Sequence, residues 1–210
     1  MNPEAPPDPV DPAVRPASRV ESAAPGEPAP LSRRVDLLLA AAALACFASH
    51  TAVHVSEGHP YDFLWVCTVA NLLIGVASLG RWPQVNAIGL LWLTLGVPLW
   101  LIDMASSRML MPTSLITHGA GPVLGLIAAR RLGFPRSMWW KALAAHVVLQ
   151  QFTRLVTPPD RNINVAFTVH PTAQALIPSY PVYWSLMLGV CALVYWTGEH
   201  LVRRLLRARR

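Results

Sequence analysis

Two residues of this 210-residue chain have side chains that could carry out group transfer together, a cysteine, Cys67, and a histidine, His118. A thiol beside an imidazole can lose its proton to become a nucleophilic thiolate, and the thioester that it forms can carry an acyl group between acceptors. Cys67 lies early in the apolar segment 62–79, and His118 lies near the start of a later apolar segment. The competing interpretation is that Cys67 is a small buried thiol that fills space between helices.

The histidines suggest a second kind of chemistry. His50 and His54 are four residues apart, so in a helix they share one face and could supply two ligands to one metal ion. Together with His118 and His146 they predict, as an alternative, a zinc, iron or copper enzyme that hydrolyses or oxidises lipids. The alternative without a metal is that these histidines form hydrogen bonds between helices. The leading interpretation, acyl transfer, needs no cofactor.

The composition indicates what must position these side chains. The chain is 53% apolar and only 13% charged, with a mean hydropathy of +0.39, which is typical of an integral membrane protein. The net charge of +6 does not predict a nucleic-acid partner, because the arginines cluster beside apolar segments as topology signals and lipid contacts do. The three cysteines lie within apolar runs, so no disulfide framework is predicted.

Six apolar segments approach the ~20 residues that a membrane-spanning helix needs. They are residues 35–55, 62–79, 84–102, 114–129, 137–156 and 182–202, separated by glycine and proline. The prediction is an all-α polytopic membrane protein with about six transmembrane helices over residues 35–202. Residues 1–34 are proline-rich and predicted to be a disordered cytoplasmic tail, and residues 203–210 a basic cytoplasmic tail.

Arginine placement predicts the orientation. One set of connectors and termini carries most of the arginines, and the opposite set carries Arg108, Arg154 and Arg161. Because cytoplasmic loops are enriched in Lys and Arg, both termini are predicted to be cytoplasmic. With that topology, the costly polar residues of the spans gather in the extracytoplasmic half of the membrane, which is a functional-site hypothesis by default.

Several stretches resemble a known family. They are FLWVCTVANLLIGVASLGRWPQVNAIGLLWLTLGVPLWLIDM, LITHGAGPVLGLIAARRLGF, RNINVAF and SYPVYWSLMLG. This pattern resembles the bacterial YwaF-type integral membrane proteins, which are related to the animal transmembrane protein 164 acyltransferases. Cys67 matches the family's cysteine, and His118 before Gly119 matches its histidine. The chain has Trp65 where the family tends to have a histidine, which leaves His118 as the expected base.

The resemblance implies acyl transfer between lipids of a bacterial cytoplasmic (inner) membrane. Cys67 and His118 are then the catalytic residues, and membrane lipids are the partners. The other site residues predicted from depth and resemblance are Gln150, Asn162 and Asn164 as oxyanion donors, Arg154 as a phosphate clamp, and Asp103 and His146 in support. For Arg154 the alternative is a side chain that extends to the interface, for Asp103 a solvated helix end, and for His146 a hydrogen-bonded core histidine.

A third functional hypothesis is that the chain is not an enzyme but a membrane transporter or an assembly factor. The small size and the lack of a convincing internal repeat speak against a transporter. Neither observation excludes a homodimer.

Overall fold

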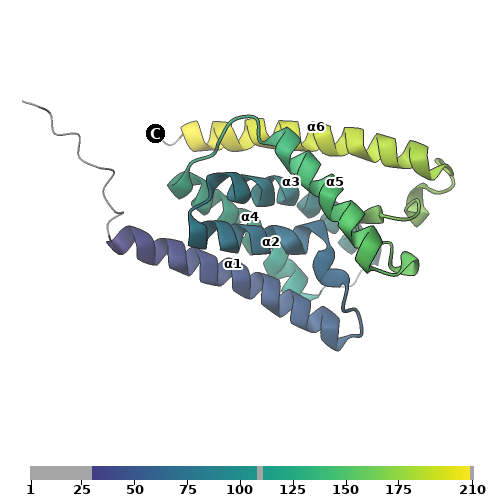
Figure 1. Ribbon diagram of the computed structural model, residues 1–210, viewed down its shortest axis with the longest axis horizontal. Coiled ribbons are helices and arrows are strands. Elements are labelled where there is room, and N and C mark those ends of the chain that lie inside the picture. Colours follow the sequence, from purple (N-terminus) through teal and green to yellow (C-terminus); the bar gives the residue numbers. More distant parts are fainter. Residues whose placement is uncertain (1–29, 108–110, 209–210) are drawn as a thin grey trace, which may run out of the picture.

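The computed structural model describes residues 30–107 and 111–208 of the chain, and over these residues it is all-helical, without a strand (Figure 1). The helices are α1 (Pro30–Ser56), α2 (Val66–Gly80), α3 (Pro83–Ser107), α4 (Pro112–Leu132), α5 (Trp139–Val156) and α6 (Tyr180–Arg207). Short 3-10 turns are η1 (Asp62–Leu64), η2 (Pro159–Arg161), η3 (Ile163–Val165) and η4 (Pro171–Ala173).

Three helices in the described part of the chain are long and apolar enough to cross a membrane. They are α1 over Arg33–Ser56, α3 over Pro83–Ala105 and α6 over Tyr180–Arg207, and α2 is a shorter apolar helix. Length and hydropathy therefore support the predicted all-helical membrane protein.

The second predicted span is divided in the structure. Residues 62–79 were predicted as one helix, but η1 ends at Leu64 and Trp65 adopts an extended conformation (φ −56°, ψ 136°) before α2 begins at Val66. Asn164 bridges this break: its Oδ1 accepts from the Val66 N–H at 3.0 Å, and its Nδ2 donates to the Leu64 carbonyl at 2.8 Å. As a result, Cys67 is the second residue of α2.

The boundaries between the predicted tails and the helices also differ from the prediction. Helix α1 begins at Pro30 rather than at residue 35, consistent with the preference of proline for the first helical turn. Residues 1–29, which hold most of the predicted disordered tail, lie outside the described residues. At the other end, α6 continues to Arg207 and so includes much of the segment predicted as a basic tail.

Helix α3 lies at the centre of the bundle and packs against α2, α4, α5 and α6. Helices α1, α2, α3 and α4 form one group, and α5 and α6 cover α3 from the other side. The core between them contains Ile74 of α2, Leu91 of α3 and Tyr195 of α6, each fully buried. Figure 1 shows α1 and α6 at opposite edges of the bundle, with α2, α3 and α4 between them.

The two ends of the bundle differ in charge. We call the end where α1 begins and α6 finishes the arginine-rich end, and both helix ends lie on the left of Figure 1. The opposite end, with His50, His54 and His59 and the 3-10 turns, is the histidine-rich end (Figure 1).

Candidate functional site

Cys67 lies at the start of α2, where a helix leaves backbone N–H groups without helical acceptors. The N–H groups of Thr68 and Val69 both bond to the Trp65 carbonyl, and Asn164 accepts from Val66. The Cys67 N–H has no acceptor among the described residues. Cys67 is partly buried among apolar helices, which disfavours a thiolate, whereas the helix start favours it, so a thiolate at this position would need a base close by.

His118 of α4 is held in an orientation that suits a base. Its Nδ1 lies 2.9 Å from the Ser114 carbonyl, and its ring stacks on Trp100 of α3 with 4.8 Å between the ring centres. Since a carbonyl can only accept, Nδ1 carries the proton and Nε2 keeps the lone pair that can take one. His118 is 5% exposed, so this orientation is fixed inside the bundle.

Asn71 connects the turn of Cys67 with the turn of His118. Its Nδ2 donates to the Cys67 carbonyl at 3.0 Å and to the Thr117 carbonyl at 3.4 Å, so it joins α2 to α4. On α3, a Cβ added at Gly96 would lie 3.0 Å from the Cys67 Cβ. Trp100, which stacks on His118, lies one helical turn from Gly96. The structure thus brings Cys67 and His118 to neighbouring turns, and no hydrogen bond joins the two side chains among the described contacts.

Three buried polar atoms beside these residues have no hydrogen-bond partner in the described part of the chain. They are the hydroxyl of Thr68, the hydroxyl of Thr117 and the Oδ1 of Asn71. Thr68 follows Cys67 in sequence and Thr117 precedes His118. Because an unpaired buried polar group is costly, this set favours a polar ligand atom between α2 and α4.

The predicted oxyanion donors have other partners. Gln150 donates to the Asn164 carbonyl at 3.0 Å, and its Oε1 accepts from the Trp184 ring N–H at 2.6 Å. Asn162 accepts from the Phe167 N–H at 2.9 Å and also donates to its own loop. Both Asn162 (φ 43°) and Asn164 (φ 54°) are left-handed, a conformation that Asn tolerates better than most residues. Asn164 holds the loop between α5 and α6 against the start of α2, and Gln150 and Asn162 hold the shape of that loop.

The remaining predicted residues are spread over the bundle. Arg154 is exposed, with its guanidinium 5.9 Å from the ring centres of both Phe167 and Tyr180. The His146 Nδ1 lies 2.7 Å from the Tyr195 hydroxyl, in the contact between α5 and α6, so His146 is the hydrogen-bonded core histidine of the alternative interpretation. Asp103 lies in the exposed last turns of α3.

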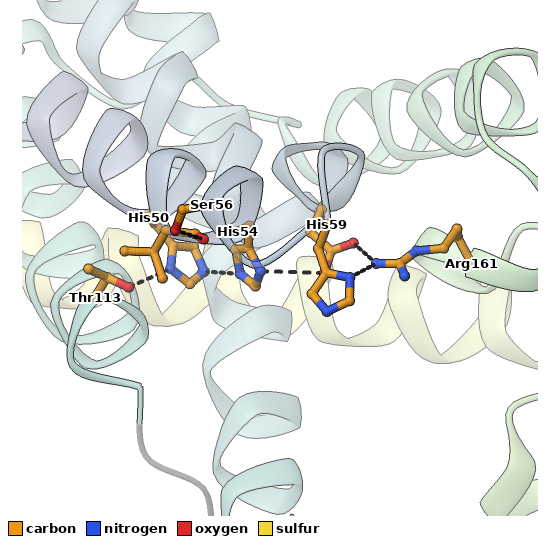
Figure 2. A network of polar contacts seen from close by, with 8 residues as sticks. His50, His54, Ser56, His59, Thr113 and Arg161 are labelled. Carbon is orange, nitrogen blue, oxygen red and sulfur yellow. Dashed lines mark hydrogen bonds and ion pairs between the residues drawn. The ribbon is translucent and has the colours of Figure 1, made fainter.

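A line of polar contacts crosses the histidine-rich end, and Figure 2 shows it. It passes through Thr113, His50, His54, Asp62, Arg161 and His59. The Nε2 atoms of His50 and His54 are 3.2 Å apart, and the Nδ1 of His54 lies 3.4 Å from Asp62. Arg161 of η2 bonds to Asp62 at 2.9 Å and to the His59 ring at 2.7 Å. The line joins α1 to η1, α4 and the α5–α6 loop.

This arrangement is a line rather than a ligand shell. His54 points one nitrogen at His50 and the other at Asp62, whereas a metal ion needs lone pairs that converge on one point. His146 bonds within the α5–α6 contact, and the His118 Nδ1 bonds to its own helix. Among the described residues, no three His, Cys, Asp or Glu side chains form a group that could hold a metal.

Sequence reasoning missed the residues that orient the candidate pair. Ser114 lies four residues before His118, the spacing at which groups on one helix face meet. The contact between Ser114 and His118 could therefore have been predicted from the sequence. Trp100 and Thr117 carried no signal, because their part depends on how α3 and α4 pack.

Comparison with protein-family models, with curated proteins and with solved structures finds no match to this chain. The likeness to YwaF-type membrane proteins therefore stays a prediction from short motifs.

Proposed function

We propose that this protein is an integral-membrane acyltransferase that remodels membrane lipids through an acyl-thioester on Cys67. The observation that carries the proposal is the Asn71 bridge, which ties the turn of Cys67 to the turn of a buried and oriented His118. The resemblance to the YwaF-type proteins supports the same pair of residues.

In the proposed membrane arrangement all six helices cross the bilayer of a bacterial inner membrane. The arginine-rich end faces the cytoplasm, as the positive-inside rule expects, and the histidine-rich end with Cys67 faces the other side. The beginning of α1 and the finish of α6 lie at the same end of the bundle, which an even number of crossings requires (Figure 1).

The first half-reaction acylates Cys67. The Nε2 of His118 takes the thiol proton, the sulfur attacks the ester carbonyl of a phospholipid, and the carbonyl oxygen becomes an oxyanion. The Cys67 N–H at the helix start is the donor to this oxyanion, in place of the predicted Asn and Gln side chains, each of which already donates to a backbone carbonyl. The C–O bond then breaks, and His118 returns the proton to the leaving alkoxide.

The second half-reaction transfers the acyl group. The hydroxyl of an acceptor lipid gives its proton to His118, and its oxygen attacks the thioester. The C–S bond breaks, and His118 returns the proton to the released Cys67 thiolate. The unpaired hydroxyls of Thr68 and Thr117 are available to bind ester or alcohol oxygens. Arg154, exposed between two aromatic rings, is placed to hold a lipid phosphate.

Acyl exchange on labelled phospholipid in vesicles tests the proposal. Cys67→Ala should abolish exchange, and His118→Gln should lower its rate by about 10²- to 10⁴-fold, the usual contribution of a general base. The matched control is Cys46→Ala, since Cys46 is a buried cysteine of α1 outside the candidate site. Full activity of a folded Cys67→Ala protein would overturn the mechanism.

A further inference from the structure

The arginine-rich end contains two adjoining cavities, of about 480 and 410 Å³. Both are lined by Arg136 of the α4–α5 connection and by Arg203 and Arg207 of α6. The first also touches Arg204, and the second touches Arg130. Guanidinium groups from two segments distant in sequence therefore surround one hollow region.

In the described part of the chain, the one carboxylate that lines these cavities, Glu199, already has partners of its own. Glu199 lines the first cavity, but its carboxylate accepts from the backbone N–H groups of Ser137, Met138 and Trp139 at 2.8, 2.7 and 2.9 Å. It also lies 3.6 Å from Arg203. These bonds satisfy the N–H groups at the start of α5 and fix the neighbouring Arg136 beside α6. Glu199 thus builds the site and supplies counter-charge to Arg203 alone among the described arginines that line it.

Four of the arginines lack a counter-ion. Over the described residues, Arg130, Arg136, Arg204 and Arg207 pair with no carboxylate, and these four lie around the cavities. An anion between them relieves the repulsion of like charges, and the planar fork of Arg binds phosphate oxygens in pairs. The chemistry of the site therefore favours a phosphate group.

The surroundings indicate which molecule carries that phosphate. Leu193, Leu201 and Leu205 are 62%, 55% and 44% exposed on α6, a candidate membrane span that ends at the cavities. Phe134 and Leu206 line the second cavity beside its arginines. A ligand with a phosphate head and apolar chains satisfies both surfaces, whereas a free phosphate satisfies only one.

We propose that the two cavities bind the phosphodiester of an anionic glycerophospholipid whose acyl chains lie along the exposed apolar face of α6. Basic pockets at the ends of membrane helices bind anionic headgroups in this way. The site lies at the opposite end of the bundle from Cys67. The cavities therefore share no residue with the proposed acyl-transfer site, and lipid binding there does not depend on acyl transfer.

Binding of tail-labelled phosphatidylglycerol to the full chain in neutral detergent tests the proposal, with labelled phosphatidylcholine and inorganic phosphate as comparison probes. Arg136→Gln and Arg207→Gln should each weaken phosphatidylglycerol binding by about fivefold, the effect of one basic residue at an anionic lipid surface. Arg34→Gln is the matched control, because Arg34 is an exposed arginine of α1 at the same end that does not line the cavities.

The comparison probes decide between the possible results. Preference for phosphatidylglycerol over phosphatidylcholine, lost in the two cavity variants and kept in Arg34→Gln, supports the site. An equal loss in Arg34→Gln would mean that only general surface charge attracts the lipid. Displacement of the labelled lipid by an equal concentration of inorganic phosphate would mean that the site takes a free anion. Either of these results overturns the proposal.

Discussion

The two ends of this bundle handle buried charge in different ways. At the arginine-rich end, Asp36 is 1% exposed and lies 2.7 Å from the Nε of Arg131 and 3.3 Å from Arg81. Guanidinium groups keep their charge at every physiological pH, so this ion pair is permanent. At the histidine-rich end, Asp62 contacts the guanidinium of Arg161 and also the imidazole of His54, a side chain that, unlike a guanidinium, exists in a neutral form.

This difference suggests that the contacts of the arginine-rich end stabilise the bundle, whereas the candidate site lies toward the histidine-rich end. Permanent ion pairs and the Glu199 bonds lock α1, α4, α5 and α6 together at one end. At the other end, imidazole rings take part in the polar contacts, and buried polar atoms beside Cys67 and His118 have no partner among the described residues. Breaking a contact at the first end should therefore cost stability, whereas breaking one near Cys67 should also cost activity.

The largest loss of stability is expected for Asp36→Asn. This change leaves Arg81 and Arg131 without their carboxylate, and removing one partner of a buried ion pair costs about 3 kcal/mol. Thermal unfolding in detergent measures the effect. Asp160→Asn is the matched control, since Asp160 is exposed at the other end of the bundle. If both variants melt at the same temperature as the parent protein, the ion pair is not part of the scaffold.

A smaller loss of stability, with a loss of activity, is expected for Asn164→Ala. It removes two buried hydrogen bonds and leaves the Val66 N–H and the Leu64 carbonyl unpaired, at a cost of about 2 kcal/mol. Because these groups define where α2 begins, the rate of acyl exchange should also fall. Asn162→Ala, which breaks bonds only within its own loop, should lower stability but leave that rate nearly unchanged. Equal activities of the two variants would contradict the role given to the start of α2.

The smallest effect is expected for Arg161→Gln. It removes the contacts of Arg161 with Asp62 and His59, but these groups are partly exposed, so the cost is about 1 kcal/mol or less. Hydrogen exchange of the amides of residues 157–165 should rise, and rising ionic strength should reduce the difference from the parent protein. An unfolding temperature as low as that of Asp36→Asn would show that the two ends are equally rigid.

The sequence predicted the helices well because a membrane span is recognised by its length and apolar content, and because glycine and proline mark the connectors. The gathering of costly polar residues in one half of the membrane stays a prediction, and the structure also buries polar side chains such as Asp36 and Glu199 at the arginine-rich end. Asp36 and Glu199 each stand in an apolar segment, where an acid is costly, so both could have been identified as buried and paired.

Other features could not be read from the sequence. The helix break at Trp65 has no glycine or proline to mark it, and its hydrogen-bond partner, Asn164, lies about a hundred residues away. The position of Cys67 at a helix start depends on that distant contact. The left-handed backbone of Asn162 and Asn164 could not be read from the sequence either, and it gives these positions a structural reason for Asn beside the predicted role as oxyanion donors.

The central claim is that Cys67 carries the acyl group, and trapping that intermediate tests it most directly. The protein is incubated with a phospholipid labelled in its acyl chain, quenched in acid and digested, and its peptides are analysed by mass spectrometry with and without hydroxylamine. The account predicts a hydroxylamine-sensitive acyl group on the peptide that contains Cys67, absent from Cys67→Ala. Acyl exchange that proceeds with no label on Cys67, or with label only on Cys46 or Cys191, would contradict it.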